Sequence, residues 1–364
     1  MSGNARRVIV VEDDPFPRIL QVLLDPAVSA ERSAAFARLM EPECPRFDQW
    51  CARVRRLAHG LCPAEVRMAQ SQEDLRASLP EASVVMVESL RIGRAELEGA
   101  PRLRVVQKYG TITRNIDLAA CEARGVKVIT LRRRVQAACA EHALALMLAL
   151  AKQLPRIGGR ISVEQLAAAG FRPATYDRAH TPTSAWAGVT GLGMLHGATL
   201  GILGMGEIGR VLAPRAAGLG MKVVYYQRTR LEPREERRFR ARYAPLDRLL
   251  AKSDWISIHL PETPETRGFL GAAELARMKR GARLVNVARA RIVDRAALID
   301  ALRSGQLGGF ALDALYEEPG RADDELLGFD NVILTPHVAG QFRTNSLLDY
   351  ADLVRGMSRA LAET

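Results

Sequence analysis

The sequence predicts an α/β fold with two doubly wound parallel sheets, on the strength of three observations. The chain has 364 residues, which is enough for two domains of ordinary size. Short apolar runs alternate with helical patterns along its whole length, as in parallel strands joined by crossover helices. A glycine-rich turn, "GMGEIG" at 204–209, directly follows one such run and opens a helical pattern.

Five strand-like runs in the first third of the chain predict one α/β unit. They are short, apolar and rich in β-branched residues, with helical patterns between them. Residues 13–63, between the first two runs, are longer than a single crossover requires and have no predicted role. The five runs are 6–12, 64–70, 82–89, 103–110 and 125–131.

A long apolar helix is predicted at 137–154, "AACAEHALALMLALAKQL". Because it is hydrophobic on all sides, we expect it to be buried between two bodies. Its most apolar part, 141–151, is too short to span a bilayer, so no membrane partner is expected. Residues 155–197 are rich in Gly, Pro and Thr and predict a long irregular connection with at most one short helix. Connections of this length are often functional or mobile.

A second α/β series fills the rest of the chain. Its six evenly spaced strand-like runs are typical of a dinucleotide-binding domain. Between two of them, Asp294 is expected to cap a helix that Gly305 terminates. The final stretch, 341–364, has the pattern of one amphipathic helix and is expected to return to the first domain. The six runs are 198–203, 222–227, 255–260, 283–288, 309–314 and 331–335.

Composition narrows the class of function. A hydrophobic share of 48% and a charged share of 26% are those of a folded, soluble protein. The net charge of +11 comes from arginines scattered along the chain without any nucleic-acid-binding motif, so a small acidic partner is expected and a nucleic acid is not. Five cysteines form no C-x-x-C pair, which predicts a reducing, cytoplasmic setting and no metal site. The N-terminus shows no apolar signal-peptide region.

The turn at 204–209 has the G-x-G-x-x-G spacing of a dinucleotide site. In such a site the first glycine makes the tight turn, the second lets the backbone approach a pyrophosphate, and the third allows close packing of helix on strand. Here these are Gly204, Gly206 and Gly209. Free N–H groups at the start of the following helix favour the phosphates, so we expect NAD or NADP as cofactor.

The end of the next strand bears on which nucleotide is bound. An acid at this position accepts the ribose hydroxyls of NAD, but this chain has Gln227, 18 residues after Gly209. Arg228 and Arg230 follow, and either of them could hold a 2′-phosphate through charged donors. The stretch therefore favours NADP. The alternative is that these are surface arginines beside a NAD site.

Three ionisable residues, Arg289, Glu318 and His337, follow the ends of three later strand-like runs. Ligands bind at the carboxyl ends of strands in an open parallel sheet, so we expect these side chains to converge there. An arginine can clamp a carboxylate and polarise the neighbouring carbonyl, and a histidine can protonate that carbonyl as hydride reaches it. A carboxylate beside the histidine favours the imidazolium.

Several stretches make this sequence resemble a known family. "NVARARIVDRAALIDALRSGQLGGFALDALYEEP" and "NVILTPHVAG" look like the signature of the D-isomer-specific 2-hydroxyacid dehydrogenases, and "AEHALALMLAL" and "HLPETPETRGFL" are similar to further family segments. The resemblance runs from about residue 84 to 340. It implies a Rossmann cofactor domain inserted in a flavodoxin-like substrate domain that both chain ends build. The domains would be 1–133, 134–336 and 337–364, and members are usually dimers.

The resemblance also implies the site residues. Arg289, Glu318 and His337 match the catalytic Arg, Glu and His, and Asp313 matches the acid that holds the nicotinamide carboxamide. Substrate-binding residues are expected at Tyr109, Gly110, Thr111 and Ile112. The cofactor-binding set is Gly204, Gly206, Glu207, Ile208, Gly209, Gln227, Arg228, Thr229, Arg230, His259, Pro261, Ala288, Asp313 and Gly340.

Two departures from the family pattern bear on the substrate. In "GTITRNID", Ile112 and Arg114 stand where the family often has glycine and an acid, which lowers backbone freedom and adds a positive charge. Ala290 stands where glycine is common after the arginine. A larger or more acidic substrate, or lost activity, are the two alternatives.

Two functions of different classes follow. The first is an NAD(P)-dependent oxidoreductase that interconverts a 2-oxo acid and its D-2-hydroxy acid, and the complete Arg289, Glu318 and His337 set favours it. The second is a dinucleotide-sensing binding protein without turnover, similar to the corepressors that resemble this family. The basic charge and the altered "GTITRNID" motivate this alternative.

Overall fold

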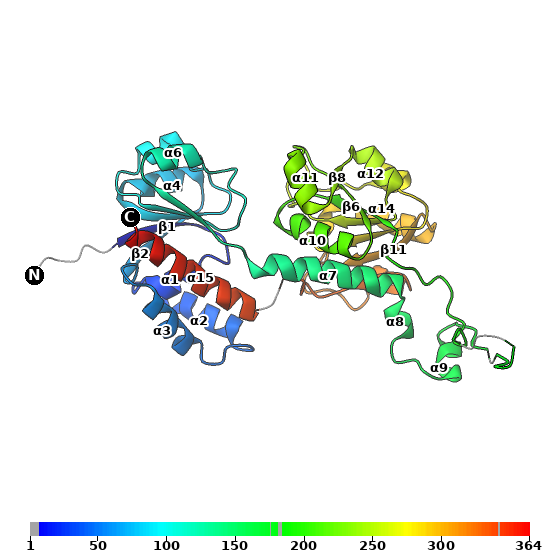
Figure 1. Cartoon of the computed structure of the whole chain (residues 1–364). Coiled ribbons are helices and arrows are strands. Elements are labelled where there is room, and N and C mark those ends of the chain that lie inside the picture. Colours follow the sequence, from blue (N-terminus) through cyan, green and yellow to red (C-terminus); the bar gives the residue numbers. More distant parts are fainter. Residues whose placement is uncertain (1–6, 175, 181–183, 341–342) are drawn as a thin grey trace, which may run out of the picture. The chain divides into compact units, whose positions relative to one another are not determined.

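The computed structural model describes residues 7–174, 176–180, 184–340 and 343–364, and the chain divides into two compact units (Figure 1). One unit comprises Met1–Val135 and Phe342–Thr364, and the other comprises Gln136–Gln341. Each contains one sheet in which the paired strands run parallel. The predicted α/β class with two doubly wound parallel sheets is confirmed.

The sheet of the first unit has the strand order β2-β1-β3-β4-β5, which is the flavodoxin-like order. All five predicted strands are present. Successive side chains of β1 point to opposite faces, so Ile9 and Val11 belong to one apolar core and Val8 and Val10 to another. The strands are β1 (Arg7–Glu12), β2 (Ala64–Ala69), β3 (Ala82–Val87), β4 (Val105–Lys108) and β5 (Lys127–Thr130).

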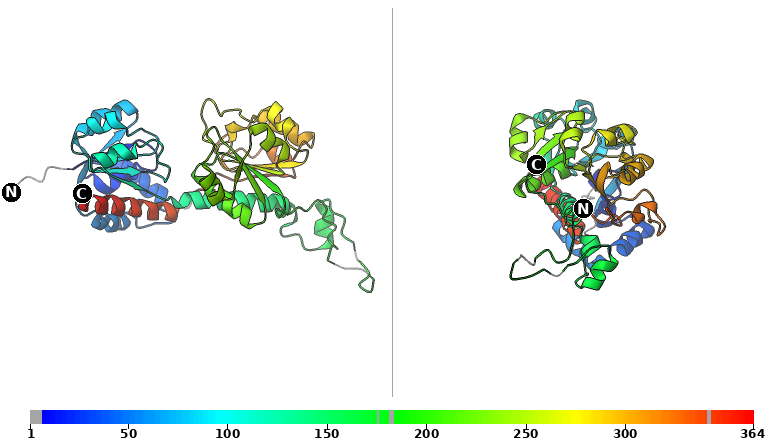
Figure 2. Two further views of the ribbon diagram at one scale, coloured as in Figure 1. Left: turned by 45° about the horizontal axis from the view of Figure 1, so that its top comes forward. Right: turned by 90° about the vertical axis from the view of Figure 1, so that its right-hand side faces the viewer.

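Helices cover both faces of this sheet. Residues 13–63, which had no predicted role, form α1 (Ile19–Leu24), α2 (Ala30–Met40) and α3 (Phe47–Leu57). They pack with the terminal helix α15 (Arg343–Ala362) over the face that carries Ile9, and α15 lies beside them in both Figure 1 and Figure 2. The first two residues of the predicted terminal helix lie outside the described residues. The other face is covered by α4 (Gln72–Ser78), η1 (Leu79–Glu81), α5 (Arg94–Glu98) and α6 (Leu118–Ala123).

The sheet of the second unit has the strand order β12-β11-β10-β9-β6-β7-β8. Its first six strands in chain order follow the Rossmann order 3-2-1-4-5-6, and one strand is added at the edge. The six predicted strands are present, but the sheet has a seventh strand, β8, so the predicted number of strands is wrong. β8 was missed because two residues are too few to show a periodic pattern. The strands are β6 (Thr199–Leu203), β7 (Lys222–Tyr226), β8 (Arg242–Tyr243), β9 (Trp255–Ile258), β10 (Ala282–Asn286), β11 (Leu307–Leu312) and β12 (Val332–Leu334).

The helices of the second unit follow its strands as crossovers. The predicted cap is confirmed: Asp294 accepts the Ala297 N–H at 2.8 Å, and Gly305 follows the helix with a φ of +68°. A φ in this left-handed region favours glycine. The elements are α10 (Glu207–Gly218), α11 (Pro233–Phe239), α12 (Leu246–Lys252), α13 (Ala272–Arg277), η2 (Ala290–Ile292), α14 (Arg295–Arg303) and η3 (Glu325–Gly328).

The predicted long helix is α7 (Arg134–Ala151), which begins and ends three residues earlier than expected. One face is buried, whereas Leu148 on the opposite face is 39% exposed. The expected burial on all sides is therefore wrong for the single chain. With 18 residues α7 is long and apolar enough to pass as a membrane span, a test that buried core helices also pass.

The connection at 155–197 contains more structure than predicted. Two short helices, α8 (Leu154–Ile157) and α9 (Val163–Ala168), occupy its first part, so the expectation of at most one is wrong. The start of α9 has a capping box in which Ser162 accepts the Gln165 N–H at 3.2 Å. This local signal, S-x-x-Q, is readable in the sequence, whereas the rest of the segment has no regular pattern.

Candidate active site

The glycine turn between β6 and α10 has unoccupied space beside its backbone at Gly206. Gly204 has a φ of +97°, and a Cβ atom there would lie 2.6 Å from the His259 carbonyl oxygen. A Cβ atom at Gly209 would lie 2.3 Å from the Gly204 carbonyl oxygen, so helix and strand pack in close contact. At Gly206, by contrast, a Cβ atom would meet nothing within 4 Å. The space beside Gly206 and the first N–H groups of α10 fits a bound pyrophosphate.

The end of β7 lies directly against this turn. The Gln227 side-chain oxygen accepts the Met205 N–H at 3.2 Å, and its amide donates to the Thr229 carbonyl at 2.5 Å. Arg230 is engaged in a two-bond ion pair with Glu236 at 2.8 and 3.0 Å. Arg228 is exposed and forms no ion pair with the residues that the structure describes. Of the two arginines predicted as phosphate ligands, Arg228 is thus the one outside an ion pair. Its charge contributes, after hydrogen bonds from Thr263 and the backbone, to the lowered pKa of Glu265.

His259, at the end of β9, adds a buried polar atom to the same turn. Its Nε2 lies 2.8 Å from the Ser257 hydroxyl, while its buried Nδ1 has no hydrogen-bond partner among the described residues. Burial lowers the pKa of His259 to about 4, so the ring is neutral at neutral pH. A buried nitrogen without a partner is costly, and it is a ready contact for a polar group of a ligand.

The remaining residues of the predicted cofactor set border this region by chain position. Glu207 and Ile208 begin α10, and the Glu207 carboxylate accepts a hydrogen bond from Gln136 of α7. Pro261 follows β9 and is exposed, and Ala288 follows β10 and is half-buried. Gly340 follows the turn after β12 and is half-buried.

His337 and Glu318 form the central contact of the second unit. The His337 Nδ1 lies 2.9 and 3.0 Å from the two carboxylate oxygens of Glu318, and Glu318 also accepts the Leu315 N–H at 3.0 Å. His337 has a φ of +53°, and its N–H donates to the Asp313 carbonyl at 2.9 Å. A carboxylate on Nδ1 orients the ring, which leaves Nε2 to exchange a proton with a ligand.

The turn that carries His337 is held by the buried carboxylate of Asp313. It accepts hydrogen bonds from the Thr335 hydroxyl at 2.6 Å and from the N–H groups of Val338 and Ala339, both at 2.9 Å. Asp313 is 1% exposed, so these bonds are not shared with water. The structure thus shows Asp313 positioning the His337 turn, a contact that sequence reasoning did not predict.

His142 of α7 extends this network and was missed from the sequence. Its Nε2 lies 3.1 Å from the Thr335 hydroxyl and 3.5 Å from the Asp313 carboxylate. Residues 142, 313 and 335 are far apart in sequence, so no local pattern links them. The only available signal is one histidine in an otherwise apolar helix.

Arg289 lies at the end of β10, and Asn286 shapes the loop that carries it. The buried Asn286 side chain donates to the Arg289 carbonyl at 2.8 Å and accepts the Ala288 N–H at 3.0 Å. The Arg289 side chain is exposed and donates to the Ala288 carbonyl at 2.7 Å. Ala290 is buried with an ordinary backbone conformation, so alanine in place of the family's glycine introduces no backbone strain.

The three predicted catalytic residues follow three neighbouring strands. Arg289 follows β10, Glu318 follows β11 and His337 follows β12, and these strands are adjacent in the sheet. All three lie beyond carboxyl ends, where ligands of parallel sheets bind. Direct contact is present between Glu318 and His337 only. Within the described ranges no group of three or more His, Cys, Asp and Glu side chains could hold a metal.

The predicted substrate-binding residues lie in the first unit, after β4. Tyr109 is buried under the Arg133 guanidinium, 4.7 Å from the ring centroid. Gly110 has a φ of +144° and its carbonyl accepts the Leu131 N–H at 3.0 Å. Thr111 is exposed and Ile112 half-buried, and neither has a positive φ. Isoleucine at the place of the second family glycine is therefore unstrained.

Charged residues that sequence reasoning missed surround this loop. The Glu88 carboxylate lies 3.2 Å from Arg133, and burial raises the pKa of Glu88. The buried Lys108 donates to the Glu88 carbonyl. Glu12 at the end of β1 accepts three backbone N–H groups of residues 88–90 at 2.6 to 2.9 Å. These contacts fix the loop after β3 beside the one after β4.

Comparisons with known proteins agree with this architecture. The family described as D-isomer specific 2-hydroxyacid dehydrogenase, NAD binding domain, matches residues 144–339. A glyoxylate reductase of Korarchaeum cryptofilum is 38% identical over 243 residues, which cover 66% of this chain and 68% of that protein. A D-3-phosphoglycerate dehydrogenase of Archaeoglobus fulgidus is 33% identical over 285 residues, 78% of this chain and 50% of that protein. The crystal structure of the PH0520 protein of Pyrococcus horikoshii matches 97% of this chain and 91% of its own, with 25% identity and a TM-score of 0.59.

Proposed function

This chain belongs to the D-isomer-specific 2-hydroxyacid dehydrogenase family, and we propose that it interconverts a 2-oxo acid and its D-2-hydroxy acid, with NADP(H) as the preferred cofactor. The contact between His337 and Glu318, in the same unit as the glycine turn, is the observation that carries the proposal. A proton donor oriented by a carboxylate is what reduction of a carbonyl requires in addition to hydride.

The chain's own residues account for the cofactor site. The turn from Gly204 to Gly209 and the start of α10 would hold the pyrophosphate, and Gln227 and Arg228 would hold the sugar with its 2′-phosphate. His259, Pro261, Ala288, Asp313 and Gly340 would line the remaining dinucleotide. The nicotinamide ring supplies or accepts the hydride when the cofactor is bound.

In the direction of reduction, Arg289 would bind the substrate carboxylate and polarise the adjacent carbonyl. His337 would donate the Nε2 proton to the carbonyl oxygen, so that one hydride and one proton convert the 2-oxo acid into the 2-hydroxy acid. Glu318 would keep the ring oriented during the transfer through its contact with Nδ1. Asp313 acts through the turn and is a positioning residue for His337.

The substrate proposed here is an acidic one. Backbone donors between Tyr109 and Ile112 would meet the substrate carboxylate, and Arg114 adds an exposed cation close by in sequence. Where the family often has an acid, this chain has that arginine, which favours a second negative charge on the substrate. If the substrate were instead a 2-oxo acid with a bulky, uncharged side chain, Arg114 would have no role.

The preference for NADP(H) rests on Arg228. An acid at Gln227 would repel a 2′-phosphate, whereas a neutral amide does not, and Arg228 stands beside it outside any ion pair of the described residues. Arg230 supports the proposal less than the sequence suggested, because Glu236 already holds its guanidinium.

Two further proposals concern the setting of the enzyme. The chain is proposed to act as a homodimer in the cytoplasm. Exposed apolar side chains on α7 and α9, such as Leu148 and Val163, support the dimer, and five free cysteines suit a reducing compartment. No nucleic acid or membrane is proposed as a partner.

The experiment that tests the function measures loss of reduced-nicotinamide absorbance with NADPH and, in parallel, NADH. The substrate panel contains glyoxylate, hydroxypyruvate, pyruvate, 2-oxoglutarate and bulkier 2-oxo acids. Turnover that favours NADPH and the dicarboxylate is the expected result. Turnover that favours NADH would overturn the cofactor preference. Cofactor binding without turnover on any acid would favour the dinucleotide sensor, which the family assignment and the His337 contact otherwise disfavour.

A further inference from the structure

A cavity lies at the amino ends of strands in the second sheet, whereas the glycine turn follows a carboxyl end. Its volume is about 820 Å³, and Thr199, Lys222 and Arg242, which line it, begin β6, β7 and β8. The glycine turn and the residues of the candidate active site instead follow the carboxyl ends of their strands. The cavity shares no residue with the predicted cofactor, catalytic or substrate sets.

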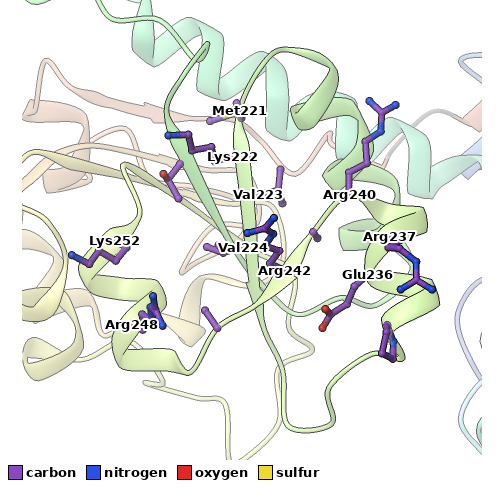
Figure 3. A pocket seen from close by; sticks show the side chains of 14 residues that line it. Met221, Lys222, Val223, Val224, Glu236, Arg237, Arg240, Arg242, Arg248 and Lys252 are labelled. Carbon is purple, nitrogen blue, oxygen red and sulfur yellow. The ribbon is translucent and has the colours of Figure 1, made fainter.

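Basic side chains dominate the charged part of the lining of this cavity (Figure 3). Figure 3 shows Arg248 and Lys252 on one side, Glu236 and Arg237 on the other, and Arg242 between them. Glu236 is the single acidic residue of the lining. The six basic residues are all exposed at the surface of the single chain and are Lys222, Arg237, Arg240, Arg242, Arg248 and Lys252.

Four acids near the cavity are engaged by cations outside its lining. Glu236 accepts Arg230 at 2.8 Å and the Tyr225 hydroxyl at 2.9 Å. Three other acids are paired in the same way: Glu235 with Arg210 at 2.8 Å, Asp247 with Arg277 at 2.6 Å and Asp254 with Lys279 at 2.7 Å. None of the six lining cations forms an ion pair within the part of the chain that the structure describes. Lys222 also interacts electrostatically with Asp254, and Glu236 is the one carboxylate of the lining, so the lining keeps an excess of positive charge that favours anions.

We propose that this cavity binds a small polyphosphate, a ligand that carries at least three linked phosphate groups. Its volume lies within the range of roughly 300–1,000 Å³ that is usual for small-molecule sites. One phosphate would neutralise only part of the charge of six cations, whereas a chain of phosphates can meet Arg242 and Arg248 at the same time. Arginine forks bind phosphate oxygens in pairs, which adds geometry to the charge.

Inorganic polyphosphate and the phosphate chain of a nucleotide share this chemistry. Met221, Val223 and Val224 add apolar surface to the lining, against which the base of a nucleotide could pack. A single-stranded nucleic acid would need a basic groove that follows its backbone over several nucleotides. The lining cations are instead gathered around one cavity, which favours the small ligand.

The test is a calorimetric titration of the full chain with sodium tripolyphosphate, with NADPH in excess to occupy the glycine turn. We expect saturable binding of one tripolyphosphate per chain. The double variant Arg242→Gln/Arg248→Gln should raise the Kd at least tenfold. Arg53→Gln/Arg56→Gln on α3 is the matched control, since both arginines are exposed and lie in the other unit, and it should leave the Kd unchanged. Arg237→Gln/Lys252→Gln is a second pair that should act like the first.

The proposal is overturned by an absence of saturable binding, by an equal loss in the control variant, or by displacement of tripolyphosphate by NADPH. Separate titrations distinguish the sources of the phosphate chain. Tighter binding of ATP than of tripolyphosphate identifies a nucleotide as the ligand, and the reverse identifies inorganic polyphosphate. Orthophosphate that binds as tightly as tripolyphosphate, or a DNA oligonucleotide that displaces it at lower concentration, contradicts a small polyphosphate site.

Discussion

The backbone of His337 is restrained as firmly as its ring. Its φ of +53° is uncommon for a residue with a side chain, and its N–H donates to the carbonyls of Asp313 and Thr335, both at 2.9 Å. The Nδ1 contact with Glu318 fixes the remaining rotation of the ring. Strain of this kind persists only where surrounding contacts over-determine the conformation, and it is concentrated at functional sites. Both restraints leave Nε2 as the free nitrogen.

The first prediction at this scale concerns the proton donor. His337→Asn should lower kcat by roughly a hundred- to ten-thousand-fold, because general acid catalysis is lost while the cofactor site is untouched. Glu318→Gln should lower kcat less, because the ring keeps its proton-donating Nε2 and loses only the carboxylate that orients it. Steady-state kinetics together with NADPH titration measure both effects. Glu317→Gln is the matched control, since Glu317 is exposed and forms no ion pair among the described residues. Full activity of His337→Asn would contradict its role.

A second prediction concerns the nucleotide. Arg228→Gln should raise the KM for NADPH roughly ten- to a hundredfold and leave the KM for NADH unchanged, because a charged hydrogen bond to the 2′-phosphate contributes about 1.5–3 kcal/mol. Arg230→Gln is the matched control. It should change the KM for NADPH less, because Arg230 is paired with Glu236. Equal effects on NADPH and NADH would show that Arg228 does not contact that phosphate.

A third prediction uses the buried ring of His259. Its pKa is lowered from 6.5 to about 4 in the folded chain, so below pH 6.5 the unfolded chain binds more protons. The contribution of His259 to the free energy of unfolding is therefore fully present above pH 6.5. It falls by up to about 3 kcal/mol as the pH drops towards 4. Urea unfolding at pH 7 and pH 4.5 should show a smaller loss for His259→Asn than for the wild type. His59→Asn, an exposed histidine, should behave as the wild type.

At the scale of elements, the passage from β6 through the glycine turn to α10 combines two different uses of glycine. Gly209 is required by packing, because any Cβ atom would meet the Gly204 carbonyl at 2.3 Å. Gly206 has a φ of −71°, which any residue adopts, and no protein atom lies within 4 Å of its Cβ position. Packing therefore explains Gly209, whereas only a ligand explains Gly206.

A fourth prediction separates these two uses. Gly209→Ala should lower the free energy of unfolding by about 1–3 kcal/mol, as overpacking does. Gly206→Ala should leave the unfolding transition unchanged and weaken NADPH binding at least tenfold, because the methyl group occupies the place of the pyrophosphate. Urea denaturation and NADPH titration are carried out on both variants. Each variant is the control for the other. A destabilised Gly206→Ala, or unchanged NADPH affinity, would contradict the assignment.

The sequence predicted elements better than it predicted contacts between them. Apolar runs and turn residues are local, so all eleven predicted strands are present. Among the strands of the described residues only β8, with two residues, was missed. The helices at 13–63 lacked a predicted role because their apolar faces pack against the first sheet, and that packing cannot be seen in the local sequence. The Glu236 partner of Arg230 and the His142 contact with Thr335 join residues from different elements, and no spacing along the chain encodes them.

At the scale of the whole molecule, apolar side chains are exposed along one part of the second unit. Ile161 is 83% exposed and Met194 is 67% exposed, and Leu148 on α7 is 39% exposed. Single exposed apolar residues are normal, but a group within one segment is typical of a surface that another chain covers. The same segment includes α8 and α9, which are too short to form a core of their own. We infer that these residues belong to the proposed dimer interface.

The last prediction tests this inference. In sedimentation equilibrium the wild type should have twice the chain mass of 39.9 kDa. Leu148→Glu/Ile161→Glu should shift it towards the monomer, because two charges would be buried without partners at the interface. Leu118→Glu is the matched control: Leu118 is 49% exposed on α6 of the first unit, and its replacement should leave the dimer intact. A wild type that sediments as a monomer at every concentration would contradict the dimer, and a dimer that survives the double variant would place the interface elsewhere. Because the double variant and the control both place glutamate only at exposed apolar sites, a difference between them reports the location of the interface and not a general loss of folding.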